Sequence, residues 1–414
     1  MKLTKTLLAS ILAITSATAF SATNYEIRMP SGSAAATEDV SVSSSSATTL
    51  VAGSNRSYLI DSSGKLSSIG DNAYGQLGSP IALGSYSPDW VDTGLTGVSS
   101  VSSTGNHAIA LMGDGTLKAV GYNGNGQLAQ AIDGGAAGPH AVWTDMGLTG
   151  VVSAQAGGNH SVALLDDGTI RLVGYNRYGQ LANTAHNSTN DATAAWVDGG
   201  LSGVKQVVAG GAVTLAVMTD GTLKGVGYNR YGSLGVATNA GSVSPNPSWL
   251  TVLTGVQSVS AGNIHTVVTM NDGSAKIAGY NRYGQIGTAT NVGTTTGVYT
   301  WTDVTLTDIK DIKAGGSHTV ALLNDGTLKA IGFNLYGQLG TAANSGSTSA
   351  TYTWVDMGLT GVQSFSIGND HTLALLNDGS VKAVGRNSAG HLMNPANIGT
   401  TTPNPTWLDA TLPE

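Results

Sequence analysis

The sequence of 414 residues contains no cysteine, which excludes disulfide bonds, thiolate metal ligands and a lipid-modified cysteine. The fold must therefore be stabilised by packing alone. Charged residues make up only 10% of the chain, against roughly 25% in an average soluble protein. Glycine, serine, threonine and asparagine take their place, and such a polar but uncharged composition is common in secreted proteins.

The chain also lacks any cluster of lysine or arginine, and its net charge is −7. A protein that follows the phosphates of nucleic acid needs such a cluster, so we expect no nucleic-acid partner. Beyond the N-terminus, no segment is long and apolar enough to cross a membrane.

One apolar run stands at the N-terminus, from Leu7 to Ala19, and Lys2 and Lys5 precede it. A basic start, an apolar core of this length and small residues after it are typical of a secretory signal. An uncleaved membrane anchor is the alternative, but the run is shorter than the ~20 apolar residues that span a bilayer. We expect cleavage after Ala19 or Ser21. The predicted domains are a signal peptide at 1–21, a flexible lead-in at 22–38 and a folded domain at 39–414.

The prominent feature of the sequence is one segment that recurs seven times. Its clearest copy reads His318-Thr-Val-Ala-Leu-Leu-Asn-Asp-Gly-Thr-Leu-Lys-Ala-Ile-Gly-Phe-Asn-Leu-Tyr-Gly-Gln-Leu-Gly340. The turn glycines and one tryptophan per copy recur every 51 to 53 residues. The glycines are Gly64, Gly115, Gly168, Gly221, Gly273, Gly326 and Gly379, and the tryptophans are Trp90, Trp143, Trp196, Trp249, Trp301, Trp354 and Trp407. Such a period indicates one supersecondary unit stacked many times.

Each unit is predicted to contain about four short strands. In the sixth unit, His318 to Leu323 alternates as a strand does, Asn324-Asp325-Gly326 suits a hairpin turn, and 327–332 is the return strand. No helical periodicity is present. Four-stranded sheets repeated radially form a β-propeller. The sequence therefore predicts an all-β, seven-bladed propeller.

The two ends of the repeat region predict how the ring closes. The segment from Trp407 to Glu414 looks like the opening of a unit, whereas 40–78 holds a hairpin without a tryptophan opening. We expect these segments to join and complete one blade together, which hides the sheet edges of an open array. The polar segments between units, such as 288–300 and 341–353, are predicted to be loops on one rim.

The repeat resembles that of the regulator-of-chromosome-condensation family. The pattern is Gly-x-x-His followed by Ser or Thr, then Asp-Gly, then Gly-x-Asn-x-x-Gly-Gln-Leu-Gly, and 157–164 and 174–181 show it plainly. The resemblance covers nearly all of 40–414 and implies a seven-bladed propeller. The histidine is replaced by Arg56 in the first copy and Val213 in the fourth, which we interpret as packing substitutions.

The family includes nucleotide exchange factors for the small GTPase Ran, a plant light receptor and a secreted bacterial inhibitor of β-lactamases. A secretory signal argues against an exchange factor, and one tryptophan per blade argues against the dense tryptophan cluster of the light receptor. The resemblance thus implies a secreted bacterial member without naming its target, because a fold alone does not define a function.

Two sets of repeated residues could carry chemistry. The repeat histidines could converge and bind a metal, but their position belongs to the repeat itself, so we expect each to bond to the backbone of its own blade. The repeated aspartates are equivalent, whereas a catalytic pair needs two different environments; we expect them to cap turns. We therefore predict no enzyme, no cofactor and no metal. The histidines are His107, His160, His265, His318 and His371.

The copies differ in the loop after the return strand of the hairpin, where three consecutive units read Tyr-Asn-Arg-Tyr and a fourth reads Phe-Asn-Leu-Tyr. In a ring these loops would form an arc on one face, and Tyr and Arg dominate binding hot spots. The alternative is that recent duplication copied the loops and the tyrosines only pack between blades. The asparagine occurs in every copy and is expected to be structural. The candidate partner-binding residues are Tyr175, Arg177, Tyr178, Tyr228, Arg230, Tyr231, Tyr280, Arg282, Tyr283 and Tyr336.

From these features we predict an exported, monomeric, non-enzymatic scaffold, periplasmic or extracellular, that engages a protein partner through one face. The first alternative is a glycan-binding or adhesive protein that uses the Thr/Asn-rich rim loops. A propeller enzyme and a GTPase exchange factor are the further alternatives.

Overall fold

The computed structural model describes residues 49–413 apart from 80–84, 133–139, 186 and 190–191. The predicted signal peptide and lead-in lie outside these residues. Every regular element in the described part is a β-strand, and 28 strands follow one another along the chain. No helix there is long and apolar enough to cross a membrane.

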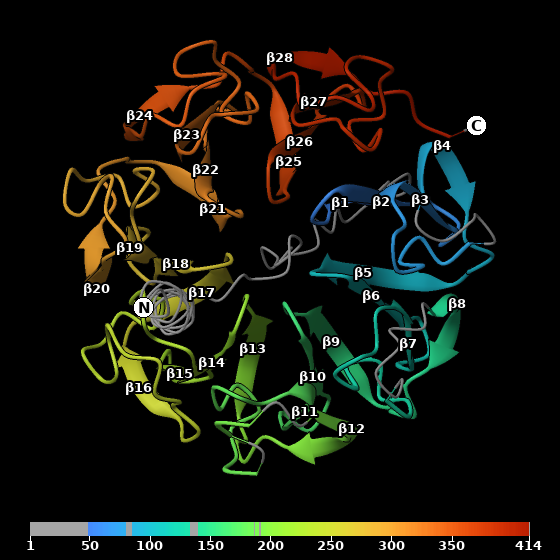
Figure 1. Cartoon of the computed structure of the whole chain (residues 1–414), viewed down its shortest axis with the longest axis vertical. Coiled ribbons are helices and arrows are strands. Elements are labelled where there is room, and N and C mark those ends of the chain that lie inside the picture. Colours follow the sequence, from blue (N-terminus) through green and yellow to red (C-terminus); the bar gives the residue numbers. More distant parts are fainter. Residues whose placement is uncertain (1–48, 80–84, 133–139, 186, 190–191, 414) are drawn as a thin grey trace, which may run out of the picture. The chain divides into compact units, whose positions relative to one another are not determined.

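The strands form seven four-stranded antiparallel sheets, which are the blades of a propeller (Figure 1). Blade 1 contains β1 (Thr49–Ala52), β2 (Arg56–Ile60), β3 (Leu66–Asp71) and β4 (Tyr86–Asp92). Blade 2 contains β5 (Val98–Thr104), β6 (His107–Met112), β7 (Leu117–Gly121) and β8 (His140–Asp145). Blade 3 contains β9 (Val151–Ala156), β10 (His160–Leu165), β11 (Ile170–Tyr175) and β12 (Ala192–Asp198). Blade 4 contains β13 (Val204–Ala209), β14 (Val213–Met218), β15 (Leu223–Gly227) and β16 (Leu250–Leu253).

The remaining three blades repeat the same order. Blade 5 contains β17 (Val256–Ala261), β18 (His265–Met270), β19 (Ala275–Tyr280) and β20 (Gly297–Asp303). Blade 6 contains β21 (Ile309–Ala314), β22 (His318–Leu323), β23 (Leu328–Gly332) and β24 (Thr351–Asp356). Blade 7 contains β25 (Val362–Ile367), β26 (His371–Leu376), β27 (Val381–Gly385) and β28 (Asn404–Asp409). The predicted all-β, seven-bladed propeller with four strands per blade is confirmed.

The core lies between the blades. One cluster of buried side chains joins Val162 and Leu172 of blade 3 to Val207 of blade 4, and the other clusters also combine neighbouring blades. Each blade therefore buries its apolar faces only against its neighbours, as expected of a repeat protein. The second strand of each blade is buried along almost its whole length, whereas most residues of the outer fourth strand are partly or fully exposed.

The turn between the second and third strands explains the repeated Asp-Gly. Gly326 has a φ of 80°, which suits glycine. Asp325 Oδ1 accepts bonds from the backbone N–H and the hydroxyl of Thr327, at 2.9 and 2.7 Å. Equivalent aspartates accept the same backbone bond in five other copies, and Ser63 stands at this position in the first copy. The prediction that these aspartates cap turns is confirmed.

The prediction that the N- and C-terminal segments complete one blade together is wrong. Each sheet is built from four strands in direct sequence order, and none combines the two ends of the chain. The tryptophan strand pairs with the hairpin before it, so Trp90 belongs to the last strand of blade 1 and Trp407 to the last strand of blade 7. A tryptophan thus closes its own blade and does not open the next one.

The ring nevertheless closes by joining the N- and C-terminal segments. Blade 1 packs against blade 7 in one apolar cluster, where Leu50 and Leu59 meet Leu373. Ala52 N–H donates to Ser366 Oγ at 2.9 Å across this seam. Trp90 Nε1 donates to the carbonyl of Thr411, beyond the last strand, at 2.7 Å.

Tryptophans link other blades in the same way. Trp196, Trp249, Trp301 and Trp407 each donate Nε1–H to a backbone carbonyl of the preceding blade, at 2.7 to 3.2 Å. The acceptors are Met146, Gly199, Val252 and Met357. The sequence period of the tryptophans therefore reflects a bond that recurs at these blade interfaces.

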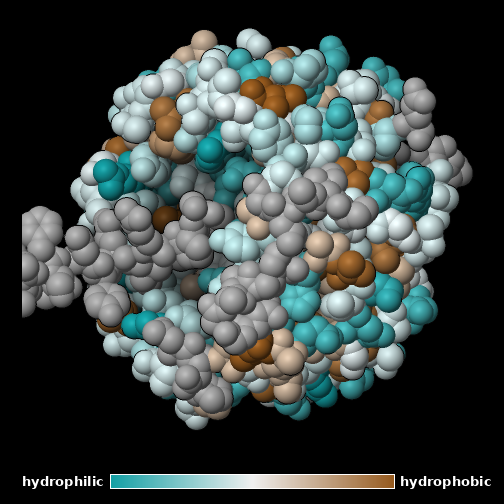
Figure 2. Space-filling view, turned by 45° about the vertical axis from the view of Figure 1, so that its right-hand side comes forward, coloured by the Kyte–Doolittle hydropathy of each residue, from teal (hydrophilic) through white to brown (hydrophobic). Residues whose placement is uncertain are grey.

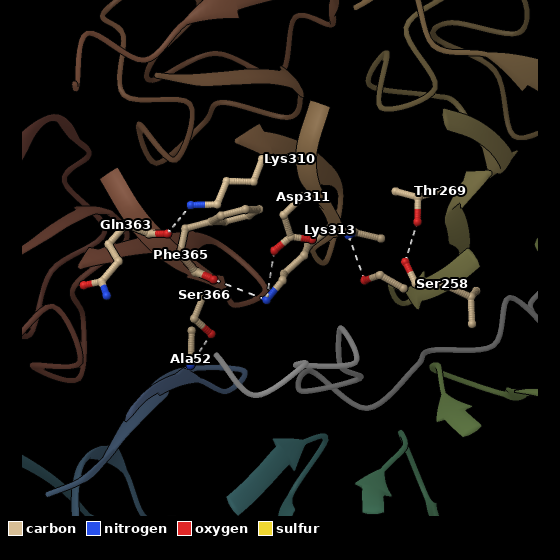
Figure 3. A network of polar contacts seen from close by, with 12 residues as sticks. Ala52, Ser258, Thr269, Lys310, Asp311, Lys313, Gln363, Phe365 and Ser366 are labelled. Atoms are coloured by element: carbon tan, nitrogen blue, oxygen red, sulfur yellow. Dashed lines mark hydrogen bonds and ion pairs between the residues drawn. The ribbon is translucent and has the colours of Figure 1, made fainter. Parts of the chain in front are cut away.

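The inner strands of adjacent blades are connected through side chains (Figure 3). Lys310 Nζ donates to the carbonyl of Gln363 at 3.1 Å. Lys313 is almost fully buried, with Nζ 3.4 Å from the carbonyl of Phe365 and 3.5 Å from Asp311 Oδ2. Both lysines therefore connect blade 6 to blade 7 and stabilise the ring.

Candidate protein-binding face

The antiparallel order of each blade places two kinds of connection on one face. The turn between the first and second strands and the loop between the third and fourth emerge there, and the Asp-Gly hairpins emerge on the other face. We call the first the loop face and the second the hairpin face. The Tyr-Asn-Arg-Tyr segments lie at the ends of β11, β15 and β19, and Tyr175 and Tyr280 are the last residues of β11 and β19. The Phe-Asn-Leu-Tyr segment follows β23, so all four segments lie on the loop face.

The asparagine of each segment holds its loop. Asn176 Oδ1 accepts a bond from Leu181 N–H at 2.8 Å, and its Nδ2 donates to the carbonyls of Asn183 and Ala185. The equivalent Oδ1 bond recurs in all seven blades, at 2.8 to 3.0 Å. Gln180 Oε1 adds a bond from Tyr178 N–H at 3.0 Å. The structural role predicted for the asparagines is confirmed, and these bonds give the adjacent tyrosines defined positions.

The tyrosines of neighbouring loops touch one another. Rings of Tyr178 and Tyr228 lie 4.5 Å apart between centroids, and rings of Tyr231 and Tyr280 lie 5.0 Å apart. Further contacts within or between loops join Tyr175 to Tyr178 at 6.4 Å, Tyr228 to Tyr231 at 5.9 Å, Tyr283 to Phe333 at 4.4 Å and Phe333 to Tyr336 at 6.3 Å. The loops of blades 3 to 6 therefore carry a row of packed aromatic rings. We call the ten predicted residues of these loops the Tyr/Arg arc.

Each arginine of the arc lies over the tyrosine that follows it. The guanidinium carbons of Arg177, Arg230 and Arg282 are 6.0, 5.7 and 5.8 Å from the ring centroids. Arg386 of blade 7 extends the pattern, 4.9 Å from the ring of Tyr336. At these distances cation–π attraction orients the guanidinium groups. Arg386 was not among the predicted residues, because its loop lacks the second tyrosine.

Burial divides the arc into two layers. Tyr228 and Tyr280 are only 3% and 8% exposed, so these two pack between blades as the duplication alternative expects. Burial raises the pKa of Tyr228 to about 12. Arg282 is exposed, and the other predicted residues are partly exposed. The accessible layer is therefore the arginines with Tyr175, Tyr178, Tyr231, Tyr283 and Tyr336, and its role in partner binding stays a prediction.

The repeat histidines do not bond within their own blade, which corrects our expectation. His160 Nε2 lies 3.0 Å from Thr214 Oγ1 in the next blade, and that hydroxyl donates to the carbonyl of Gln180 in the blade of His160. His107, His265 and His318 make the equivalent contact with the next blade. Burial lowers the pKa of His160 to about 4 and that of His107 to about 3, so both imidazoles are neutral at neutral pH.

Three interfaces depart from this contact, and at the interface of blades 4 and 5 Val213 takes the histidine position. At the interface of blades 1 and 2, Arg56 Nε donates to Ser103 Oγ at 2.8 Å. Blade 2 has Ala108 where blades 3, 4, 6 and 7 have the serine or threonine that contacts the histidine. Tyr58 OH donates instead to the carbonyl of Gln76, at 2.5 Å. At the seam between blades 7 and 1, the rings of His371 and His391 lie 4.6 Å apart, both fully buried. The sequence pattern did not single out His391, which takes the position of the repeat glutamine.

In the described residues, no three His, Cys, Asp or Glu side chains gather in a way that could hold a metal ion.

The predicted rim loops are shorter than expected, because the ends of 288–300 and 341–353 belong to β20 and β24. In the first loop Asn291 Nδ2 bonds to the carbonyl of Gly297 at 2.8 Å. The glycan-binding alternative stays a prediction.

Comparison with known proteins agrees with this geometry. The family model described as the regulator of chromosome condensation (RCC1) repeat matches residues 98–127, 151–180, 309–338 and 362–390. The ultraviolet-B receptor UVR8 of Arabidopsis thaliana is 28% identical over 346 residues, which cover 82% of this chain and 77% of the receptor. The probable E3 ubiquitin-protein ligase HERC6 of Homo sapiens is 31% identical over 242 residues, which cover 57% of this chain but only 23% of the ligase.

Solved structures show the same architecture. Human WBSCR16 superposes with a TM-score of 0.66 at 21% identity, over 81% of this chain and 87% of that chain. Prp20p of Saccharomyces cerevisiae superposes with a TM-score of 0.65 at 18% identity, over 79% of this chain and 82% of that chain. At these identities the likeness concerns the fold alone. Four segments of this chain therefore match the RCC1 repeat, and the chain folds as a seven-bladed β-propeller like that of these solved structures.

Proposed function

We propose that this propeller is a non-enzymatic scaffold that binds a protein partner through the Tyr/Arg arc. The observation that carries the proposal is the row of packed tyrosine rings with one arginine lying over each of three neighbouring loops. Such groups lose little conformational freedom on binding, because the asparagine bonds and the ring contacts already hold them in place. Tyrosine and arginine are also the residue types that most often dominate protein interfaces.

The surface favours this mode of binding over an apolar one. In the view of Figure 2, where grey atoms do not cover the surface, hydrophobic residues form only small, separate patches among hydrophilic ones. A partner that required a large exposed apolar patch would find none in that view. An interface built from tyrosine and arginine suits a protein that must remain folded and free until it meets its partner.

Related propellers support a protein partner. The structure of Prp20p is described together with its binding to Gsp1p and histones, and Kap60 has been solved bound to yeast RCC1 (Prp20). We extend this mode of action to the present chain. We further propose that the chain is exported by its N-terminal signal, reaches the periplasm or the outside of a bacterial cell and acts there as a monomer.

The test is a triple substitution, Arg177→Ala with Arg230→Ala and Arg282→Ala. The matched control is Lys276→Ala with Lys329→Ala and Lys382→Ala, which removes three cations paired with exposed aspartates near the hairpin face. Surface pairs of this kind contribute little to stability. Both variants and the parent are immobilised and exposed to envelope and culture-medium proteins of the source cell and of cells that it meets.

If the three arginines together contribute about 3 kcal/mol or more, the affinity of the captured partner should fall more than about 100-fold in the arginine variant. The lysine variant should bind as the parent does. Equal capture by the parent and the arginine variant would reject the arc as the binding surface. Steady turnover of any substrate in a broad screen would reject the non-enzymatic assignment.

A further inference from the structure

Charge is segregated between the two faces of the propeller. Most described aspartates stand at the ends of strands or in hairpins on the hairpin face. These are Asp61, Asp92, Asp114, Asp145, Asp166, Asp167, Asp198, Asp220, Asp272, Asp303, Asp308, Asp325, Asp356, Asp378 and Asp409. The lysines of the third strands accompany them: Lys276, Lys329 and Lys382 pair with Asp303, Asp356 and Asp409. The hairpin face therefore carries both signs of charge.

The loop face of blades 3 to 6 differs. Within the described residues of those blades, the loops and turns on this face contain no aspartate, glutamate or lysine, and their charged residues are Arg177, Arg230 and Arg282. Asp370, in blade 7, is the next carboxylate along the face, and it lies 3.6 Å from Arg386. Within the described residues, this half of the loop face thus carries only cationic side chains, although the chain has a net charge of −7; Asp191, in the loop of blade 3, lies outside the described residues.

Arg177, Arg230 and Arg282 lie in the loops of three consecutive blades, so they form a regularly spaced row along the face. Their planar guanidinium groups are held over tyrosine rings and can meet carboxylates in a two-point geometry that lysine cannot match. The polar rings beside them offer hydroxyl groups and flat surfaces to the intervening residues of a polypeptide. An extended acidic segment would follow such a row.

Resting on the proposed function, we infer that the Tyr/Arg arc recognises an acidic segment of its protein partner, with carboxylates placed against Arg177, Arg230 and Arg282. Charge complementarity is the reason for choosing this occupant. Nucleic acid and sulfated glycan are also polyanions, but only three arginines on a net anionic protein give them little backbone neutralisation. A second copy of this chain could bind the arginines through the aspartates of its hairpin face. Sedimentation velocity distinguishes this self-association from binding of an acidic partner.

The experiment measures the binding of a fluorescein-labelled polyglutamate peptide to the full-length protein by fluorescence anisotropy. Polylysine, oligothymidylate and a heparin oligosaccharide of similar length serve as comparison probes. Polyglutamate should bind, and its affinity should fall at least about tenfold in the Arg177, Arg230 and Arg282 alanine variant. The Lys276, Lys329 and Lys382 alanine variant should retain it. Raising the salt concentration should weaken binding, as expected of exposed charges.

Three results would overturn the inference. They are no polyglutamate binding at low salt, equal binding by the arginine variant, or tighter binding of oligothymidylate or heparin. Concentration-dependent self-association of the parent in sedimentation velocity, abolished in the arginine variant, would replace the acidic partner by a second copy. Arginine-dependent capture of a cellular partner without polyglutamate binding would leave the proposed function intact and reject only the acidic segment.

Discussion

Replacing His160 by valine should make the propeller less sensitive to acid. The imidazole is fully buried between blades 3 and 4, and its burial lowers the pKa to about 4. In the unfolded chain a histidine titrates near a pKa of about 6.5. Below that pH the unfolded chain binds a proton that the folded chain does not bind. The stability contributed by His160 is therefore fully present above about pH 6.5 and is lost as the pH falls towards 4.

The size of the effect follows from the difference between the two pKa values. At about 1.36 kcal/mol per unit, a difference of about 2.5 units corresponds to a total loss of ~3.4 kcal/mol, which is complete only below pH 4. Near pH 5 the loss is about 2 kcal/mol. Each of the other buried repeat histidines adds a loss in the same direction, because burial lowers the pKa of His107, His318 and His371 to about 3 and that of His265 to about 4.

Valine is the substitution that the chain itself suggests. Val213 occupies the histidine position of blade 4, where Thr266 of the next blade still donates to the carbonyl of Ser233 at 2.7 Å. In the His160→Val variant, Thr214 should likewise keep its bond to the carbonyl of Gln180. The lost imidazole contact should cost about 1 kcal/mol at neutral pH.

The assay is urea unfolding followed by tryptophan fluorescence at pH 7 and at pH 5. Between these conditions the parent should lose about 2 kcal/mol more of its free energy of unfolding than the His160→Val variant. His140, which is only partly buried at the start of β8, supplies the control variant His140→Ala, and it should follow the parent. An identical pH dependence in the parent and in His160→Val would refute the assignment of acid sensitivity to the buried imidazole.

Three further substitutions test the blade interfaces and the loops. Trp249→Phe removes the 2.7 Å bond to the carbonyl of Gly199 and should lower the free energy of unfolding by about 1 kcal/mol. Trp143→Phe should cost less in the same urea titration, because the buried Nε1 of Trp143 has no hydrogen-bond partner among the described residues. His391→Gln restores the residue found at this position in most blades and, because burial holds the pKa of His391 well below 6.5, should raise the melting temperature at pH 5 more than at pH 7. Asn229→Ala removes three side-chain hydrogen bonds of its loop, at 2.8 to 3.0 Å, and should lower the free energy of unfolding by about 2 to 3 kcal/mol. Amide hydrogen exchange in that loop should become faster, and unchanged exchange would contradict the structural role of Asn229.

The repeat made the architecture predictable. A hairpin requires residues of a particular kind at its turn, so the amino-acid pattern alone assigns Asp325 and Gly326 to one. The same holds for Asn176, whose side chain bonds only to nearby positions of its own loop. Local interactions of this kind leave a direct pattern in the sequence.

The phase of the repeat was not predictable in the same way. A period has no beginning, so the sequence did not show whether Trp407 opens or closes a blade. Strand pairing decides it: β28 joins β27 of the same unit. The histidine contacts were missed for a related reason, because His160 and Thr214 stand 54 residues apart and meet only across a blade interface.

The sequence by itself determined the number of blades, the hairpin turns and the loops that hold the Tyr/Arg arc, since each depends on contacts within one repeat. Only the tertiary structure decided which tyrosines are accessible, because the burial of Tyr228 and Tyr280 depends on how closely neighbouring blades approach. It also decided that the arginines share a face without carboxylates across the described loops of blades 3 to 6. Charges far apart in the chain become one surface only when the ring is formed.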